Sequence, residues 1–169
     1  MLDSASIPAL EAGLKGCAGR PVINSINLED GGARAGAILA LARDFGAAVV
    51  CLAIDEQGMA RDRARKAAVL KRLHDLAIGS GLRSEDVFLD PLTFTLASGD
   101  PGLAAAGVET LAALPLLKKT MPRAHTLLGV SNISFGLKPA TRQVLNSAFL
   151  HYALEAGLTS AIVHFSKIK

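Results

Sequence analysis

Short, β-branched apolar runs alternate along this chain with longer segments whose apolar residues recur at helical spacing. Such alternation is typical of parallel βαβ units, in which each strand is followed by a helix that packs on the sheet. Few of the runs alternate polar and apolar residues, which indicates strands covered on both faces. The expected strands are residues 21–26, 47–54, 86–90, 124–130 and 160–165.

The intervening segments predict helices at residues 5–15, 33–45, 59–78 and 138–155, and one that starts at Pro101. Because proline lacks a backbone N–H, Pro115 is expected to kink or split the helix that starts at Pro101. Val108 and Leu111 are expected to face inward there. In the last helix the apolar spacing places five residues inward: Val144, Leu145, Ala148, Phe149 and Tyr152.

No linker or charge block divides the chain, so we expect a single domain over residues 1–169. Five strands followed by helices fit either a doubly wound sheet or part of a (β/α)₈ barrel. A complete barrel needs at least about 200 residues, so this chain is short of one. The first helix begins after no more than a remnant strand at Met1-Leu2, as if the chain starts inside a fold.

Composition excludes several classes of function. Eighteen Lys and Arg against 15 Asp and Glu give a net charge of +3, with one Tyr and no Trp, which does not predict nucleic-acid binding. No apolar run approaches the roughly 18–20 residues of a membrane-spanning helix, and the first residues do not resemble a signal peptide. Two distant cysteines and four unclustered histidines predict neither a disulfide framework nor a metal site. We therefore expect a cytoplasmic α/β protein.

Polar side chains stand at or near the carboxyl end of every expected strand but the last, where parallel folds collect their ligands. Each of them also suits the N-cap of the next helix. Their convergence on one edge favours a binding site instead. They are Asp3, Asn24, Asp55, Asp90 and Asn132.

The residue types favour a particular ligand. Ionised carboxylates accept hydrogen bonds, and asparagine both donates and accepts them, which suits a neutral heterocycle with amino, amide and ring N–H groups. Acidic groups repel phosphate, and no glycine-rich phosphate loop is present. Gly31-Gly32 is interpreted as a helix start, and the basic residues 61–66 as a solvated helix face.

Several blocks together resemble one family. They are the segments 21–26 (PVINSI), 49–58 (VVCLAIDEQG), 87–99 (VFLDPLTFTLASG), 127–137 (LLGVSNISFGL) and 142–164. These segments resemble the pterin-binding domain of cobalamin-dependent methionine synthase and, less closely, the methyltetrahydrofolate–corrinoid methyltransferases. More distantly they resemble dihydropteroate synthase, which shares the barrel. The resemblance spans nearly the whole chain, and residues 129–136 (GVSNISFG) are its most specific block.

The resemblance implies an incomplete (β/α)₈ barrel, roughly its last five to six βα units, that binds a folate's pterin ring. By motif, the ring-binding residues fall on Asp3, Asn24, Asp90 and Asn132. Asn132 takes the catalytic role, adjusting the hydrogen bonds at N5 of 5-methyltetrahydrofolate so that its methyl group can leave. The acceptor is the Co(I) of a cobalamin on another domain or protein. The family relationship thus implies a methyltransferase.

The chain also departs from the family pattern. The first two strands and most of a third are expected to be missing, which leaves sheet edges open to pairing in a homo-oligomer. The sequence contains no Asp-x-His-x-x-Gly cobalamin signature. One alternative is a dihydropteroate synthase-like enzyme, disfavoured because the Gly-rich loop and Ser-Arg-Lys element of that enzyme are absent. The other is an inactive truncated fragment.

Overall fold

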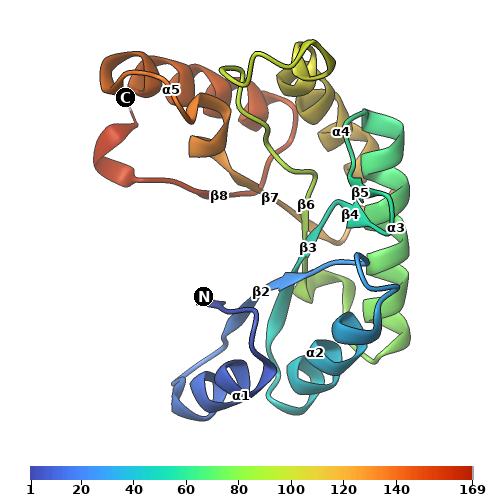
Figure 1. Cartoon of the computed structure of the whole chain (residues 1–169). Coiled ribbons are helices and arrows are strands. Elements are labelled where there is room, and N and C mark those ends of the chain that lie inside the picture. Colours follow the sequence, from blue (N-terminus) through green and yellow to red (C-terminus); the bar gives the residue numbers. More distant parts are fainter. Residues whose placement is uncertain (169) are drawn as a thin grey trace.

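A single curled sheet of six parallel strands forms the centre of the computed structural model, which describes residues 1–168 (Figure 1). The strands follow the order β1-β2-β3-β6-β7-β8, so each lies beside its neighbour in the chain. Their bounds are Leu2–Asp3, Val22–Ile26, Ala48–Leu52, Val87–Asp90, His125–Gly129 and Ser160–Ile162. Lys169, the last residue of the expected domain, lies outside the described residues.

An α-helix follows each of the first five strands of this sheet, a short 3₁₀ turn (Phe165–Lys167) follows β8, and the α-helices lie on the outside of the curl (Figure 1). They are α1 (Ile7–Gly16), α2 (Ala33–Asp44), α3 (Arg63–Gly79), α4 (Ala106–Thr120) and α5 (Pro139–Glu155). All five expected strands and five expected helices are present, and Leu2–Asp3 adds the remnant strand. This arrangement confirms the expected incomplete (β/α)₈ barrel.

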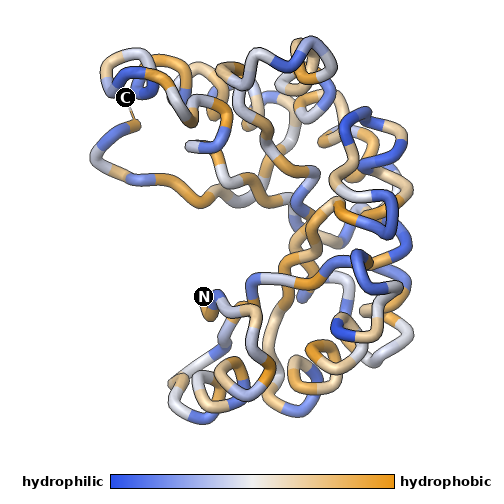
Figure 2. The backbone as a smooth tube through the Cα atoms, viewed as in Figure 1, coloured by the Kyte–Doolittle hydropathy of each residue, from blue (hydrophilic) through white to orange (hydrophobic). Residues whose placement is uncertain are grey.

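The core lies between the sheet and the helices, and Figure 2 shows hydrophobic residues concentrated along the strands. The larger of two buried clusters joins strands β2, β3 and β6 to helices α1, α2 and α3 through residues such as Ile23, Val49, Leu89, Ile38 and Leu70. The smaller cluster lies under β7, α4 and α5 and includes Leu114, Leu128, Phe149 and Ala153. Burial of these side chains from water is the main favourable term in folding.

The second expected strand is shorter than the sequence indicated. It ends at Leu52, and Ile54–Asp55 (β4) then pairs antiparallel with Gly58–Met59 (β5). The helix after this hairpin starts at Arg63 instead of residue 59. Asp62 is the N-cap of α3: its side chain accepts a hydrogen bond from the backbone N–H of Arg65 at 2.9 Å.

Pro115 does not split its helix, so of the two effects expected for this proline, a kink or a split, the split is wrong. Helix α4 runs from Ala106 to Thr120, and a short 3₁₀ turn precedes it at Pro101–Leu103. Pro115 has no N–H to donate to the carbonyl four residues earlier. Because Pro115 is exposed, water can reach this part of the helix and bind that carbonyl instead. Leu114 and Leu117 are fully buried on the opposite side and hold both halves of the helix against the sheet.

Four apolar residues that were expected to face inward are exposed. Val108 is 64% exposed, Val144 is 71% exposed, Tyr152 is 58% exposed, and Ala148 is also at the surface. Helix α5 carries two apolar stripes, and the one that contains Phe149 and Ala153 packs on β7. Leu145 and Phe149 were expected to face inward and do pack in this cluster, so the expected inward face of α5 was right in part and too wide.

We expect Leu114→Ala to lower the free energy of unfolding by about 2–5 kcal/mol, because it removes a fully buried side chain and leaves a cavity. Chemical denaturation followed by circular dichroism measures the change. Leu116→Ala is the matched control: Leu116 lies on the same helix but is 37% exposed, so the expected loss is below about 1 kcal/mol. Equal losses for the two variants would contradict the orientation of α4.

Candidate functional site

Asp3 and Asn24 lie side by side on the first two strands. The register of β1 with β2 pairs them directly, and Nδ2 of Asn24 donates a hydrogen bond to Oδ2 of Asp3 at 3.1 Å. Beyond Asp3, the carbonyl of Ser4 accepts a hydrogen bond from Nη2 of Arg34, in the first turn of α2, at 3.3 Å. Strand pairing and Arg34 therefore hold Asp3 and Asn24 at one edge of the sheet.

Asp90 ends β6 and shares the inner face of the sheet with Asn24. The strand registers place Asn24 opposite Val50, and Val50 opposite Phe88. Paired residues share a face of a sheet, and so do residues two apart, so Asp90 projects to the same side as Phe88. Ile23, Val49 and Leu89 belong to the core beneath the helices, so this side is the concave one, opposite the helices.

A stacked aromatic pair lies on the same inner face, one pleat below Asp90. The rings of Phe88 and His125 stack with their centroids 4.9 Å apart. The register of β6 with β7 pairs these two residues directly. The inner face thus combines a flat ring surface with polar groups nearer the carboxyl ends of the strands.

The carboxyl group of Asp90 is almost completely buried, with 8% of the residue exposed. Burial raises its pKa to about 7, while the N–H of Leu92 and the ammonium of Lys66 partly oppose the rise. The Leu92 N–H donates to Oδ1 of Asp90 at 2.8 Å. Leu92 itself has φ 65°, a left-handed conformation that costs a residue with a side chain roughly 1–2 kcal/mol.

Asn132 lies just beyond the carboxyl end of β7, in the 3₁₀ turn Val130–Ser134, and is exposed. A β-carbon placed on Gly129 would lie 3.4 Å from its Nδ2, so the amide group lies close to the end of the strand. From α5, Arg142 donates to the carbonyl of Ser131 at 3.3 Å and to Oγ of Ser134 at 3.1 Å. These contacts from the helix fix the turn that carries Asn132.

The four expected binding residues therefore occupy different levels of the sheet. Asp3 and Asp90 end their strands, Asn132 follows the end of β7, and Asn24 lies at the centre of β2. Two of these four residues contact each other directly, because the side chain of Asn24 donates a hydrogen bond to that of Asp3.

Asp55, the fifth polar strand end, has a structural role. Its Oδ1 lies 2.5 Å from Nη2 of Arg65, and its Oδ2 lies 3.8 Å from Nη1 of Arg72. Burial would raise the pKa of Asp55, but the hydrogen bonds from Arg65 and from the Gln57 N–H outweigh it and hold the pKa below its usual value. The carboxylate secures the β4–β5 hairpin to α3.

Lys66 is the residue near the site that the sequence interpretation missed. It belongs to the basic segment 61–66, expected as a solvated face, yet its side chain is fully buried. Its Nζ donates to the carbonyl of Pro91 and, at 3.2 Å, to the carbonyl of Leu92. Lys66 precedes buried Val69, Leu70 and Leu73 by three, four and seven residues, and this helical spacing identifies it as an inward position.

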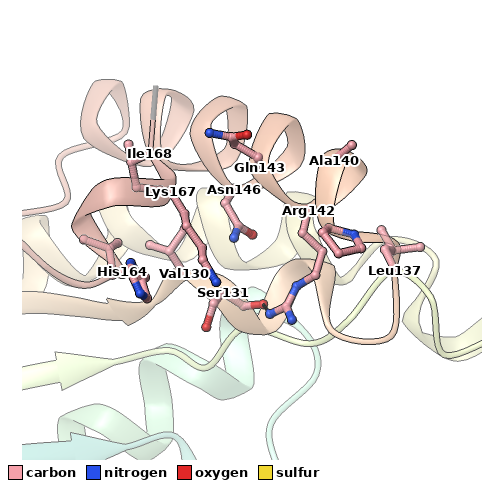
Figure 3. Close-up of a pocket in the computed structure, with 12 residues that line it drawn as sticks. Val130, Ser131, Leu137, Ala140, Arg142, Gln143, Asn146, His164, Lys167 and Ile168 are labelled. Carbon is pink, nitrogen blue, oxygen red and sulfur yellow. Dashed lines mark hydrogen bonds between the residues drawn. The ribbon is translucent and has the colours of Figure 1, made fainter.

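A cavity of about 510 Å³ opens next to the turn that carries Asn132 (Figure 3). It lies between that turn, the start of α5 and the segment after β8. Ser131, Arg142, His164 and Lys167 supply polar groups to its wall. None of the four expected binding residues lines it, so it adjoins their edge of the sheet as a separate space.

Neither a metal cluster nor a membrane span is found among residues 1–168. No three His, Cys, Asp or Glu side chains of this part of the chain converge as metal ligands. No helix in it is long and apolar enough to cross a bilayer.

Comparison with known proteins matches residues 1–164 to the family of pterin binding enzymes. Two similar curated proteins are methionine synthases, from Mycobacterium leprae (51% identical) and Mycobacterium tuberculosis (49% identical). Each alignment covers 99% of this chain and 14% of the relative, so the chain spans about one seventh of their length.

Solved structures with the same fold include a dihydropteroate synthase from Xanthomonas albilineans in complex with 7,8-dihydropteroate, with a TM-score of 0.70 and 21% identity. Yersinia pestis DHPS with a pterine–sulfa conjugate also has a TM-score of 0.70, at 19% identity. The matches cover 96% of this chain and 59% and 61% of those chains. At such identities the likeness establishes the fold.

We expect Asp55→Asn to destabilise the fold by about 1 kcal/mol at pH 7, a modest loss because Arg65 stays 29% exposed to water. The folded-state pKa of Asp55 is lowered, so its stabilisation is present above the unfolded pKa and is lost as pH falls through the lower, folded value. The difference from the unsubstituted protein should therefore shrink below pH 3.8 in urea denaturation curves. Asp44→Asn, at an exposed pair with Arg43, is the control. A difference that persists undiminished in acid would argue against the ion pair.

Proposed function

We propose, from the premise that this chain belongs to the pterin-binding enzyme family, that it binds the pterin ring of 5-methyltetrahydrofolate and presents the N5 methyl group for transfer. The observation that carries the proposal is the gathering of Asp3, Asn24 and Asp90 on the concave face, where Asp3 and Asp90 end their strands and Asn24 pairs with Asp3. The similarity to two methionine synthases supports the choice of methyl transfer.

The chemistry of the site suits a flat, neutral, polar ring. Pterin presents amino, amide and ring N–H donors along one edge, and carboxylates are the strongest neutral-pH acceptors for them. Asp90 is buried, so its hydrogen bonds to the ring form away from competing water. Asn24 can both donate and accept, and Asp3 orients its amide. The stacked rings of Phe88 and His125 offer a flat surface on the same side.

Asn132 is proposed to act at N5 of the folate. A methyl group leaves a neutral amine more readily than an amide anion, so a proton or a strong hydrogen bond at N5 lowers the barrier. The Asn132 side chain lies at the end of β7, one strand from Asp90, on a turn held by Arg142. It adjusts the hydrogen bonds at N5 while the other three residues hold the ring.

The methyl acceptor is proposed to be a cobalamin carried by another domain or protein, which supplies a Co(I) nucleophile. The sequence holds no Asp-x-His-x-x-Gly signature for binding this group. The methionine synthases that resemble the chain are about seven times longer, which leaves ample length for such a domain in them. This chain's part is to bind and orient the folate.

The cavity of about 510 Å³ next to Asn132 is proposed to receive the p-aminobenzoyl-glutamate part of the folate. That part carries carboxylates, and Arg142 and Lys167 place two cationic side chains on the cavity wall (Figure 3). Leu137, Pro139 and Val163 supply apolar surface for the benzoyl ring. The pterin would then lie on the concave face and the tail beside α5.

We expect Asp90→Asn to weaken binding of 5-methyltetrahydrofolate by about 10–100-fold, because the substitution keeps the shape but loses the charge of a buried acceptor. Isothermal titration calorimetry measures the dissociation constant. Asp44→Asn, an identical change at an exposed residue of α2, is the matched control and should bind like the unsubstituted chain. Unchanged affinity in a folded Asp90→Asn protein would refute the assignment of the site.

We expect Asn132→Ala to lower the rate of methyl transfer from 5-methyltetrahydrofolate to free cob(I)alamin by about 100-fold while affinity for the folate changes less than about 10-fold. Loss of the cob(I)alamin absorption band follows the reaction. Asn27→Ala, at a residue just beyond β2, serves as the control, because its side chain accepts a hydrogen bond from the Glu29 N–H within its own loop. A rate that survives in Asn132→Ala would remove this residue from the chemistry.

A further inference from the structure

We propose that Lys66 is a positioning residue of this site, whose buried ammonium holds the backbone after β6 so that Asp90 is directed at the pterin ring, and whose charge favours the ionised form of the Asp90 carboxyl. The inference rests on the proposed function, because it assigns Asp90 to the ring. Lys66 touches the Asp90 loop from behind, from helix α3, and is not itself proposed to touch the ligand.

Within residues 1–168, the hydrogen bonds and the ring contact of the Lys66 ammonium fall on one segment. Its Nζ donates to the carbonyls of Pro91 and Leu92, the two residues after Asp90. The same Nζ lies 4.9 Å from the centre of the Phe94 ring, a cation–π distance. A fully buried lysine whose contacts fall within residues 91–94 acts on the position of that loop.

The loop needs such support because Leu92 has a left-handed backbone. Three hydrogen bonds hold it: the Leu92 N–H donates to Asp90, and the Leu92 carbonyl accepts from Lys66 and, at 2.8 Å, from Oγ1 of Thr110 in α4. A strained residue persists where its surroundings determine it strongly, and such residues concentrate at functional sites. Helices α3 and α4 together therefore determine the direction of the Asp90 carboxyl.

The charge of Lys66 also acts on Asp90. Three carboxylates face this ammonium electrostatically: Asp90 from β6, Asp62 at the start of α3, and Glu109 from α4. Asp62 caps α3, and Glu109 is bound by Arg63 at 2.8 Å. Among residues 1–168, Lys66 is the cation that acts on Asp90 and favours its charged form. An apolar side chain would fill the same space without the cost of burying a charge. Packing therefore does not explain a lysine at this position, whereas its charge beside Asp90 does.

The test compares 5-methyltetrahydrofolate affinity from pH 5 to 9 in the unsubstituted chain, Lys66→Met, Thr110→Val and the exposed control Lys71→Met. Ring N–H groups bind the ionised carboxylate, so affinity should rise with pH through about 7, where Asp90 deprotonates. Lys66→Met removes the nearby cation, so we expect affinity at pH 7 to fall at least 10-fold and the rise to move to higher pH. Thr110→Val should weaken binding without moving the midpoint, and Lys71→Met should change neither.

Each outcome decides the matter. Unchanged affinity in Lys66→Met, or weaker binding with an unmoved midpoint, would overturn the proposal, since a purely structural lysine would not move the midpoint. If Lys66→Met does not fold, Lys66→Gln, which keeps a donor and loses the charge, carries the same expectation. If neither the unsubstituted chain nor any variant binds the folate, the proposed function fails. The effect of Lys66 on Asp90 is then tested separately, by following the ¹³C carboxyl resonance of Asp90 against pH in the ligand-free protein. A titration midpoint unmoved by the substitution would overturn its role.

Discussion

The alternation of side chains along in-register parallel strands is the constraint on which this structure depends. Ile23, Val49 and Leu89 project toward the helices and form the core, so their neighbours Asn24, Val50, Phe88 and Asp90 project to the concave face. A shift of one residue in any strand would exchange the two sets, exposing the core and burying the polar groups. The fold is therefore stabilised and the candidate site assembled by the same strand pairing.

The fold and the positions of the four candidate residues were predictable because both follow from short-range patterns. β-branched runs separated by helical segments predict βα units, and polar strand ends in parallel units meet at one edge. The β4–β5 hairpin, the outward stripe of Val144 and Tyr152, and buried Lys66 were not predicted. The orientation of Val144 and Tyr152 depends on which surface of α5 its neighbours cover, a tertiary choice that a local pattern does not contain. Lys66 was hidden within a run of exposed basic residues, although its spacing from Val69 and Leu73 marks it as inward.

Asp90 and Lys66 illustrate a cost in stability at the candidate site. Burial raises the pKa of Asp90 to about 7 and lowers that of Lys66 to about 8, so each charged form is less favourable in the folded chain than in the unfolded one. For Asp90 the folded-state pKa lies above the unfolded value, so its penalty is absent below pH 3.8 and grows as pH rises toward about 7. A bound ring with N–H donors would offset that penalty, which links ligand binding to ionisation of this carboxyl.

The most direct test of the account is a crystal structure of the chain with tetrahydrofolate. We expect the pterin ring on the concave face, with its N–H edge within hydrogen-bond distance of Asp90 and Asn24 and its N5 side toward Asn132. A ring bound elsewhere, with the carboxyl group of Asp90 still turned to the protein alone, would contradict it.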